Sequence, residues 1–241
     1  MANDILVFGE LTEEGRLAPI TFELLGAARR LADQLGSRVL CAILGAGLDG
    51  QSRDAIAQGA DAVLLVDDPL LQEYQGDAFV PVLERLVREK NPALVLLGQT
   101  MAGRELGPRL AARLGTAVTM DAIDVAVQDG RIIVTRPCYG GNAHAKYSFN
   151  TSPAVVTLRA KSQEPIERDE SRQGEVEKVQ AGIDAGAVRT RVLGRVKQKA
   201  EGVRLEDARI VVAGGRGPVS YTHLRAHETP EHLVCRLLLE K

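Results

Sequence analysis

Residues 38–44 read Arg-Val-Leu-Cys-Ala-Ile-Leu, and after its first residue this stretch is unbroken apolar sequence. Three shorter runs of the same kind occupy residues 5–8, 62–66 and 94–97. Short continuous runs rich in Val, Leu and Ile are typical of strands that are buried on both faces of a parallel sheet. The four runs therefore predict the strands of such a sheet.

Segments with a helical pattern separate these runs, over residues 19–35, 49–58, 77–90 and 106–114. The first begins with a proline, and three of the four end just before a glycine. Proline in the first turn and glycine just past the last turn are common helix boundaries. The alternation of strands and helices predicts an α/β fold of the Rossmann-like type, a parallel sheet with helices on both faces.

The pattern changes after residue 120. Residues 122–128 and 131–135 flank the dipeptide Asp129-Gly130, which is a strong hairpin signal. Two more strands are predicted over residues 143–149 and 154–158. We therefore expect a first domain over residues 1–160, in which antiparallel strands extend the parallel sheet.

The remaining residues divide into three predicted parts. Residues 161–206 are charge-dense and are expected to connect two domains, with one strand over 190–196. Residues 207–218 contain an apolar run followed by Gly214-Gly215-Arg216-Gly217, the pattern that opens a nucleotide-binding α/β domain. The glycines let backbone N–H groups approach a diphosphate, and Arg216 supplies charge-assisted hydrogen bonds. Residues 219–241 hold three of the four histidines and are expected to be a non-native tail.

Composition excludes several classes of function. The net charge is −2 and only 3% of residues are aromatic, which argues against a nucleic-acid-binding surface. No apolar run of about 18 residues is present, so no membrane span is predicted. The N-terminus has no leader pattern, and the three cysteines are widely separated, so we expect a cytoplasmic protein without a disulfide framework.

The segment Gly45-Ala-Gly47-Leu-Asp-Gly50 matches the dinucleotide-binding pattern G-x-G-x-x-G, with Asp67 and Asp68 about 20 residues further on. Against a dinucleotide site, the segment follows the second predicted strand instead of the first. The chain also has 24 glycines, so a chance match in a βα loop is the favoured interpretation.

Two further segments are candidates for binding. In residues 98–115 a helix N-terminus could hold an anion, or Leu106, Leu110 and Leu114 could simply pack inward. Arg104, Arg109 and Arg113 would then form a solvated or partner-facing edge. Residues 136–142, Arg-Pro-Cys-Tyr-Gly-Gly-Asn, are either a projecting binding loop or a tight turn.

No catalytic residue and no metal site are predicted. Cys138 has only His144 nearby in sequence, which does not identify a nucleophile. His223, His227 and His232 have helical spacing but fall in the expected foreign tail. Any chemistry is therefore expected to belong to a cofactor.

Taken as an ordered set, residues 98–115, 136–142 and 210–217 resemble the alpha subunit of electron transfer flavoprotein. Residues 5–10, Ile-Leu-Val-Phe-Gly-Glu, and 59–61, Gly-Ala-Asp, fit the same family. The resemblance covers residues 1–218. It implies a fold like that of the adenine nucleotide alpha hydrolases, followed by the first strand of a second α/β domain.

The resemblance also implies a function. A heterodimer with a beta subunit would carry electrons on FAD, from acyl-CoA dehydrogenases of fatty acid β-oxidation or related flavoenzymes to a quinone oxidoreductase or another acceptor. The chain would be an electron carrier and not an enzyme. Arg216 would contact FAD beside Gly214, Gly215 and Gly217. Because the family's remaining FAD motifs lie beyond Gly217, we expect a truncated chain that does not hold FAD alone.

Two alternatives stay open at this point. One is a nucleotide-binding sensor domain for ATP or AMP, of the universal-stress or alpha-hydrolase-like class. The other is a pure subunit-interaction domain.

Overall fold

The computed structural model describes residues 4–184, 186, 188–190, 192–194 and 210. The chain divides into two units, residues 1–192 and residues 193–241. All the helices and strands described below belong to the first unit. The domain boundaries predicted from the sequence at residues 160, 206 and 218 stay predictions.

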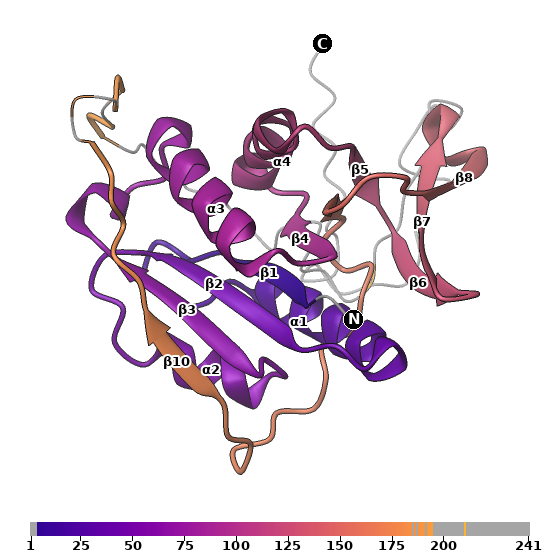
Figure 1. Cartoon of the computed structure of the whole chain (residues 1–241), viewed down its shortest axis with the longest axis horizontal. Helices are drawn as coiled ribbons and strands as arrows, with labels where there is room; N and C mark the ends of the chain where they lie inside the picture. Colours follow the sequence, from indigo (N-terminus) through magenta and orange to yellow (C-terminus); the bar gives the residue numbers. More distant parts are fainter. Residues whose placement is uncertain (1–3, 185, 187, 191, 195–209, 211–241) are drawn as a thin grey trace, which may run out of the picture. The chain divides into compact units, whose positions relative to one another are not determined.

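Seven strands form the main sheet, in the order β10-β3-β2-β1-β4-β9-β5 (Figure 1). Every neighbouring pair in it is parallel. The strands are β1 (Ile5–Gly9), β2 (Val39–Gly45), β3 (Ala62–Asp67), β4 (Leu94–Gly98), β5 (Val118–Ala122), β9 (Ala154–Leu158) and β10 (Glu175–Lys178). The four apolar runs of the sequence are thus the four central strands β1 to β4, and the predicted fold class is confirmed.

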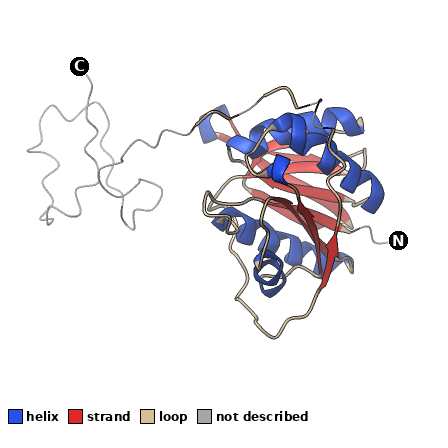
Figure 2. Ribbon diagram, turned by 90° about the vertical axis from the view of Figure 1, so that its left-hand side faces the viewer, coloured by secondary structure: helices blue, strands red, loops and turns tan. Residues whose placement is uncertain are grey.

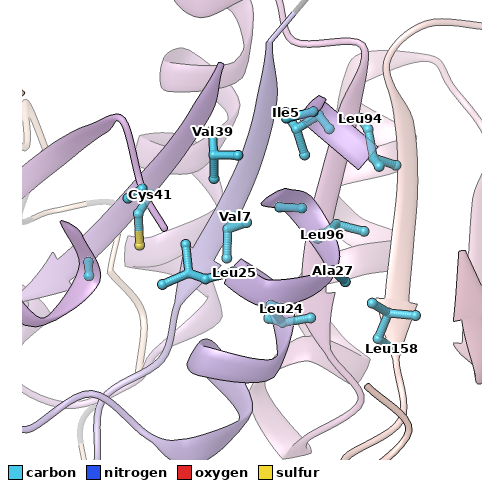
Figure 3. Close-up of a cluster of buried hydrophobic side chains, with 14 of the residues drawn as sticks. Ile5, Val7, Leu24, Leu25, Ala27, Val39, Cys41, Leu94, Leu96 and Leu158 are labelled. Carbon is cyan, nitrogen blue, oxygen red and sulfur yellow. The ribbon is translucent and has the colours of Figure 1, made fainter. Parts of the chain in front are cut away.

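Helices cover both faces of this sheet (Figure 2). They are α1 (Pro19–Leu35), α2 (Gln51–Ala57), α3 (Gly76–Lys90) and α4 (Met101–Leu114), with a short 3₁₀ helix η1 (Pro69–Leu71). Side chains alternate along each strand, so successive residues enter different cores. Ile5 and Val7 pack with α1 and α2, whereas Leu6 and Phe8 pack with α3 and α4. Figure 3 shows the first of these cores, with Leu24 and Leu25 of α1 against the strands.

The helix boundaries follow the predicted signals. Helix α1 ends at Gly36 and α4 at Gly115, both in the left-handed conformation, and α3 ends at Asn91 with φ 47°. Helix α4 begins at Met101, five residues earlier than predicted. The side chain of Thr100 caps it by accepting a hydrogen bond from the Gly103 N–H at 3.1 Å.

The predicted hairpin is confirmed and belongs to a separate sheet. Strands β6 (Asp124–Gln128), β7 (Arg131–Cys138) and β8 (Ala143–Ser148) form a three-stranded antiparallel sheet. Its turn, Asp129-Gly130, has positive φ at both residues, as a tight hairpin requires. Val125 and Val134 are buried in the core beneath α1, which anchors one end of this sheet. After β8 the chain returns to the main sheet as β9.

Residues 161–183 wrap around the main sheet as a strap, and strand β10 lies within it. The strap passes so close to α1 that a Cβ added to Gly26 would lie 2.4 Å from the carbonyl oxygen of Glu164. Arg53 donates to the carbonyl groups of Arg172 and Glu170, and Arg85 does the same for Gln180. Of the predicted strand over residues 190–196, residues 190 and 192–194 carry no regular secondary structure, and residues 191, 195 and 196 lie outside the described residues.

Asp61 ties the strap to the sheet. Its Oδ2 accepts hydrogen bonds from the Val39 N–H at 2.8 Å and from Arg29 at 2.7 Å. Its Oδ1 accepts one from Arg172 of the strap at 2.9 Å. Burial raises the pKa of this carboxyl, but the donors outweigh that effect and leave the pKa below its usual range. One carboxylate therefore joins α1, β2 and the strap.

Candidate functional site

The order of the strands places a switch point between β1 and β4. From β1 the chain runs through β2 to β3 on one side, then crosses to β4 on the other side. In open parallel sheets of this kind, ligands bind in the crevice outside the carboxyl ends of the two strands at the switch point. Here Glu10 follows β1, and Gln99 and Thr100 follow Gly98, the last residue of β4.

Glu10 occupies this crevice with its own carboxylate. Its Oε1 accepts a hydrogen bond from the Thr100 hydroxyl at 2.9 Å, next to the N-terminus of α4. A Cβ added to Gly98 would lie only 2.8 Å from the same oxygen. Burial raises the pKa of Glu10 to about 7, although the hydrogen bonds from Thr100 and the backbone of Gly98 work against this shift.

Glu10→Gln is expected to change how stability depends on pH. The folded pKa of about 7 lies above the ordinary value of 4.5, so stabilisation by the bound proton is full below pH 4.5 and is lost as pH rises through 7. Glutamine imitates the protonated acid. The variant should therefore match the parent at pH 4 and exceed its free energy of unfolding at pH 8 by up to about 3 kcal/mol.

Urea unfolding at a series of pH values measures this difference. The Asp49→Asn variant, which removes an exposed surface carboxylate, serves as a control. A Glu10→Gln curve that runs parallel to that of the parent chain would contradict the raised pKa of Glu10.

A second group of polar side chains lies on β9 and β5, at the same carboxyl edge of the sheet. Thr157 of β9 donates its hydroxyl proton to Gln99, and the same hydroxyl accepts a hydrogen bond from the Asp121 N–H at 2.9 Å. Asp121 has φ 59°, an uncommon conformation for a residue other than glycine. Arg159 makes a two-point ion pair with its carboxylate, at 3.0 and 2.7 Å.

Arg159 contacts Asp121, and two further arginines act on its charge from a distance. The hydrogen bond from Arg159 lowers the pKa of this carboxyl, and the charges of Arg159, Arg136 and Arg104 lower it further. The arginines come from β7, from α4 and from the residue after β9, so only the fold brings them together. Because one carboxylate is near three arginines, the local net charge beside β5 and β9 is positive.

The glycine motif at residues 45–50 is not available to a phosphate group. The Gly47 and Leu48 N–H groups, which would bind a phosphate, donate to the two carboxylate oxygens of Asp67 at 2.9 and 3.1 Å. Asp68 caps η1 by accepting from the Leu70 N–H. The carboxylate that the motif would assign to a ribose thus fills the loop itself, and a dinucleotide does not fit there.

Two of the three arginines predicted to form an edge along α4 make ion pairs with α3. Arg109 pairs with Asp77 of α3 at 2.6 Å and with Glu105 at 2.5 Å. Arg113 pairs with Glu84 of α3 at 3.0 Å. These ion pairs link α3 to α4. Arg104, in the first turn of α4, is exposed and forms no ion pair with the described residues.

Residues 136–142 form the tip between β7 and β8. Tyr139 is 86% exposed, and positive φ at Tyr139, Gly140 and Gly141 makes the tight turn. Cys138 lies opposite Ala143, whereas His144 lies opposite Pro137, so the two side chains point to different faces of the sheet. The structure does not bring the thiol and the imidazole together.

The residues predicted to contact a cofactor, Gly214, Gly215, Arg216 and Gly217, lie outside the described residues, as does the predicted tail over 219–241. In the described part of the chain, no group of three or more His, Cys, Asp or Glu side chains is placed to hold a metal ion. No helix in that part has the length and apolar character needed to cross a membrane.

Sequence reasoning missed Glu10, Asp121, Thr157 and Arg159 as members of this edge. One signal was present, because Glu10 is an acidic residue directly after a buried strand. The others depend on β9 entering the sheet between β4 and β5, which no local pattern indicates.

These features define a doubly wound α/β domain whose carboxyl edge is filled by its own side chains. The chain belongs to the electron transfer flavoprotein domain family, whose family model matches residues 5–184. The resemblance found in the sequence is thereby confirmed, and a nucleotide-sensing domain of the universal-stress class is not favoured.

Named relatives agree with this assignment. Protein FixB of Clostridium saccharobutylicum is 40% identical over 216 residues, which cover 88% of this chain and 64% of the relative. Electron transfer flavoprotein subunit alpha of Thermoanaerobacterium thermosaccharolyticum is 37% identical, covering 89% and 65%. The subunit of the same name from Bacillus subtilis is 36% identical, covering 90% and 65%. The chain thus spans just under two thirds of the length of these relatives.

Proposed function

We propose that this chain is the N-terminal part of an electron transfer flavoprotein alpha subunit. Its partner is a beta subunit, and the complex carries electrons on FAD from acyl-CoA or related dehydrogenases to a quinone oxidoreductase or another acceptor. The observation that carries this proposal is the family match over residues 5–184, together with relatives named as alpha subunits. The chain is a carrier subunit and not a substrate-converting enzyme, and a cytoplasmic location stays a prediction.

The geometry of the described residues supports a scaffolding role for this domain. Glu10 fills the crevice at the switch point, and Asp67 fills the glycine loop. The two places where a fold of this type usually binds a nucleotide are therefore occupied by acidic side chains of the chain itself. In this proposal FAD is bound elsewhere, with contacts from Arg216 and the glycines beside it.

A direct test is complex formation. The purified chain is mixed with its cognate beta subunit and analysed by size-exclusion chromatography with light scattering. We expect a 1:1 complex. A chain that remains monomeric at micromolar concentrations and low salt, and instead binds ATP or AMP in calorimetry, would contradict the proposal.

The 241-residue chain by itself is expected not to retain FAD. A single arginine–phosphate contact at Arg216 contributes about 1.5–3 kcal/mol, whereas a micromolar site requires about 8 kcal/mol. The purified chain should be colourless, and added FAD should elute separately on desalting. A stoichiometric flavin spectrum that survives desalting and is unchanged in Arg216→Ala would overturn both the prediction and the assignment of Arg216.

A further inference from the structure

Two arginines near the carboxyl edge of the main sheet are not used by the fold. Arg104, in the first turn of α4, is exposed, and Arg136 of β7 is partly buried. Among the described residues, neither side chain has a hydrogen-bond or ion-pair partner. The neighbouring arginines differ in this respect, because Arg109, Arg113 and Arg159 each bind a carboxylate.

The side chain of Arg136 is fixed by the packing of β7. Side chains alternate along the strand, so Arg136 lies on the same face as Val134, which is buried in the core beneath α1. The Nε atom of Arg136 is buried and has no hydrogen-bond partner in the described part of the chain. An unpaired buried donor is unusual in a folded protein. Such a guanidinium is stabilised when its terminal nitrogens bind an anion.

The fold brings the two arginines to one place. Strands β5 and β7 lie side by side (Figure 1), and the Thr135 carbonyl oxygen accepts a hydrogen bond from the Ile123 N–H at 2.9 Å. Arg136 therefore lies beside the end of β5. Helix α4 packs against β5 as well, and its first turn, which carries Arg104, begins just after β4 ends. The charges of both arginines lower the pKa of Asp121, so both lie near this carboxylate.

The carboxylates of this region do not neutralise the two arginines. Asp121 is engaged by Arg159 in a two-point ion pair, at 3.0 and 2.7 Å. Asp124 lies on the other face of the antiparallel sheet, since it pairs with the residue before Arg136. Glu10 follows β1, three strands from β5, which corresponds to about 14 Å for strands about 4.8 Å apart. Positive charge therefore remains between α4 and β7.

The donors at this position match a phosphate group better than a carboxylate. One carboxylate is filled by a single two-point arginine, as Asp121 is by Arg159. A phosphate group has enough oxygen atoms for two guanidinium groups, and it carries more negative charge. The N-terminus of α4 adds a dipole that favours an anion.

We propose that Arg104 and Arg136 form a site for a phosphate group of a small molecule, at the carboxyl ends of β5 and β9 between α4 and β7. Arg136 binds the group from β7 and Arg104 binds it from α4. The site is distinct from residues 214–217, to which the proposed function assigns contacts with FAD, and it does not depend on that assignment.

Calorimetric titration of the full chain with sodium pyrophosphate, at pH 7 and low salt, tests the site directly. We expect a dissociation constant below about 1 mM. Arg136→Gln and Arg104→Gln should each weaken binding about tenfold, because each removes a charge-assisted two-point contact. Arg131→Gln is the matched control. It removes an exposed arginine at the other end of β7 and should change affinity less than about twofold.

Two further measurements separate a binding role from a structural one. Arg136→Lys keeps the charge but loses the paired donors, so its affinity should lie between those of the parent chain and Arg136→Gln. Circular dichroism shows whether each variant is folded. In nitrogen-15 NMR spectra, pyrophosphate should shift the amides of residues 101–104 and 121–123 and leave those of β10 unchanged.

Titrations with ADP and with inorganic phosphate identify the source of the phosphate group. Tighter binding of ADP than of pyrophosphate would assign the site to a nucleotide, and the reverse order would assign it to a smaller phosphate compound. Either order supports the site if binding requires Arg136. Equal weakening in Arg131→Gln and Arg136→Gln would show only general attraction of anions to a basic surface and would overturn the proposal. Absence of binding at millimolar pyrophosphate would overturn it as well.

Discussion

Gly103→Ala is expected to lower the free energy of unfolding by about 3 kcal/mol or more, because no room exists for a methyl group. A Cβ at this position would lie 1.8 Å from the carbonyl oxygen of Gly98 and 3.0 Å from its carbonyl carbon. Both are backbone atoms at the end of β4, so neither can turn aside. The first turn of α4 would have to lift from the sheet, which would separate Thr100 from Glu10.

Gly107→Ala is the matched control on the same helix. Its Cβ would meet the methyl group of Thr157 at 3.1 Å, a contact that a small side-chain movement relieves. Alanine also gains about 1 kcal/mol in helix propensity over glycine. Urea unfolding followed by circular dichroism should therefore separate the two variants by several kcal/mol. Equal stabilities would show that α4 does not depend on its close approach to β4.

Asp61→Ala is expected to cost about 2–4 kcal/mol, since it leaves the Val39 N–H and two arginines without their acceptor. The side chain of Arg29 is only 13% exposed, so water compensates poorly for the lost carboxylate. The strap should loosen together with Arg172, which donates to the same carboxylate. Faster proteolytic cleavage within residues 161–178 should accompany the lower midpoint of unfolding.

Asp33→Ala provides the comparison for Asp61→Ala. Asp33 pairs with the same arginine at 2.8 Å, but its side chain is 64% exposed. Exposed ion pairs within a helix contribute only about 0.3–0.5 kcal/mol, so this variant should be nearly as stable as the parent. If Asp33→Ala lowered the free energy of unfolding as much as Asp61→Ala, the ion pair of Arg29 would explain both losses. The hydrogen bonds of Asp61 to Val39 and Arg172 would then contribute little.

The strands and helices of the central sheet could be predicted from local sequence patterns. Unbroken apolar runs can only be buried on both faces, and they became β1 to β4 with α1 at the predicted bounds of Pro19–Leu35. Glycine stops and the Asp129-Gly130 turn are local conformational requirements, so they too were readable from sequence. The family resemblance likewise came from ordered local segments.

The contacts between residues far apart in the sequence became evident from the three-dimensional fold. It placed β9 between β4 and β5, and β10 beside β3, because strand order depends on which apolar faces remain to be covered. It directed the side chain of Asp67 toward the loop at residues 45–50. The N–H groups that would bind a phosphate in a nucleotide-binding loop donate to this carboxylate instead. The fold also brought Arg159 into contact with Asp121, and Arg104 and Arg136 near enough for their charges to act on it, although no sequence period connects these residues.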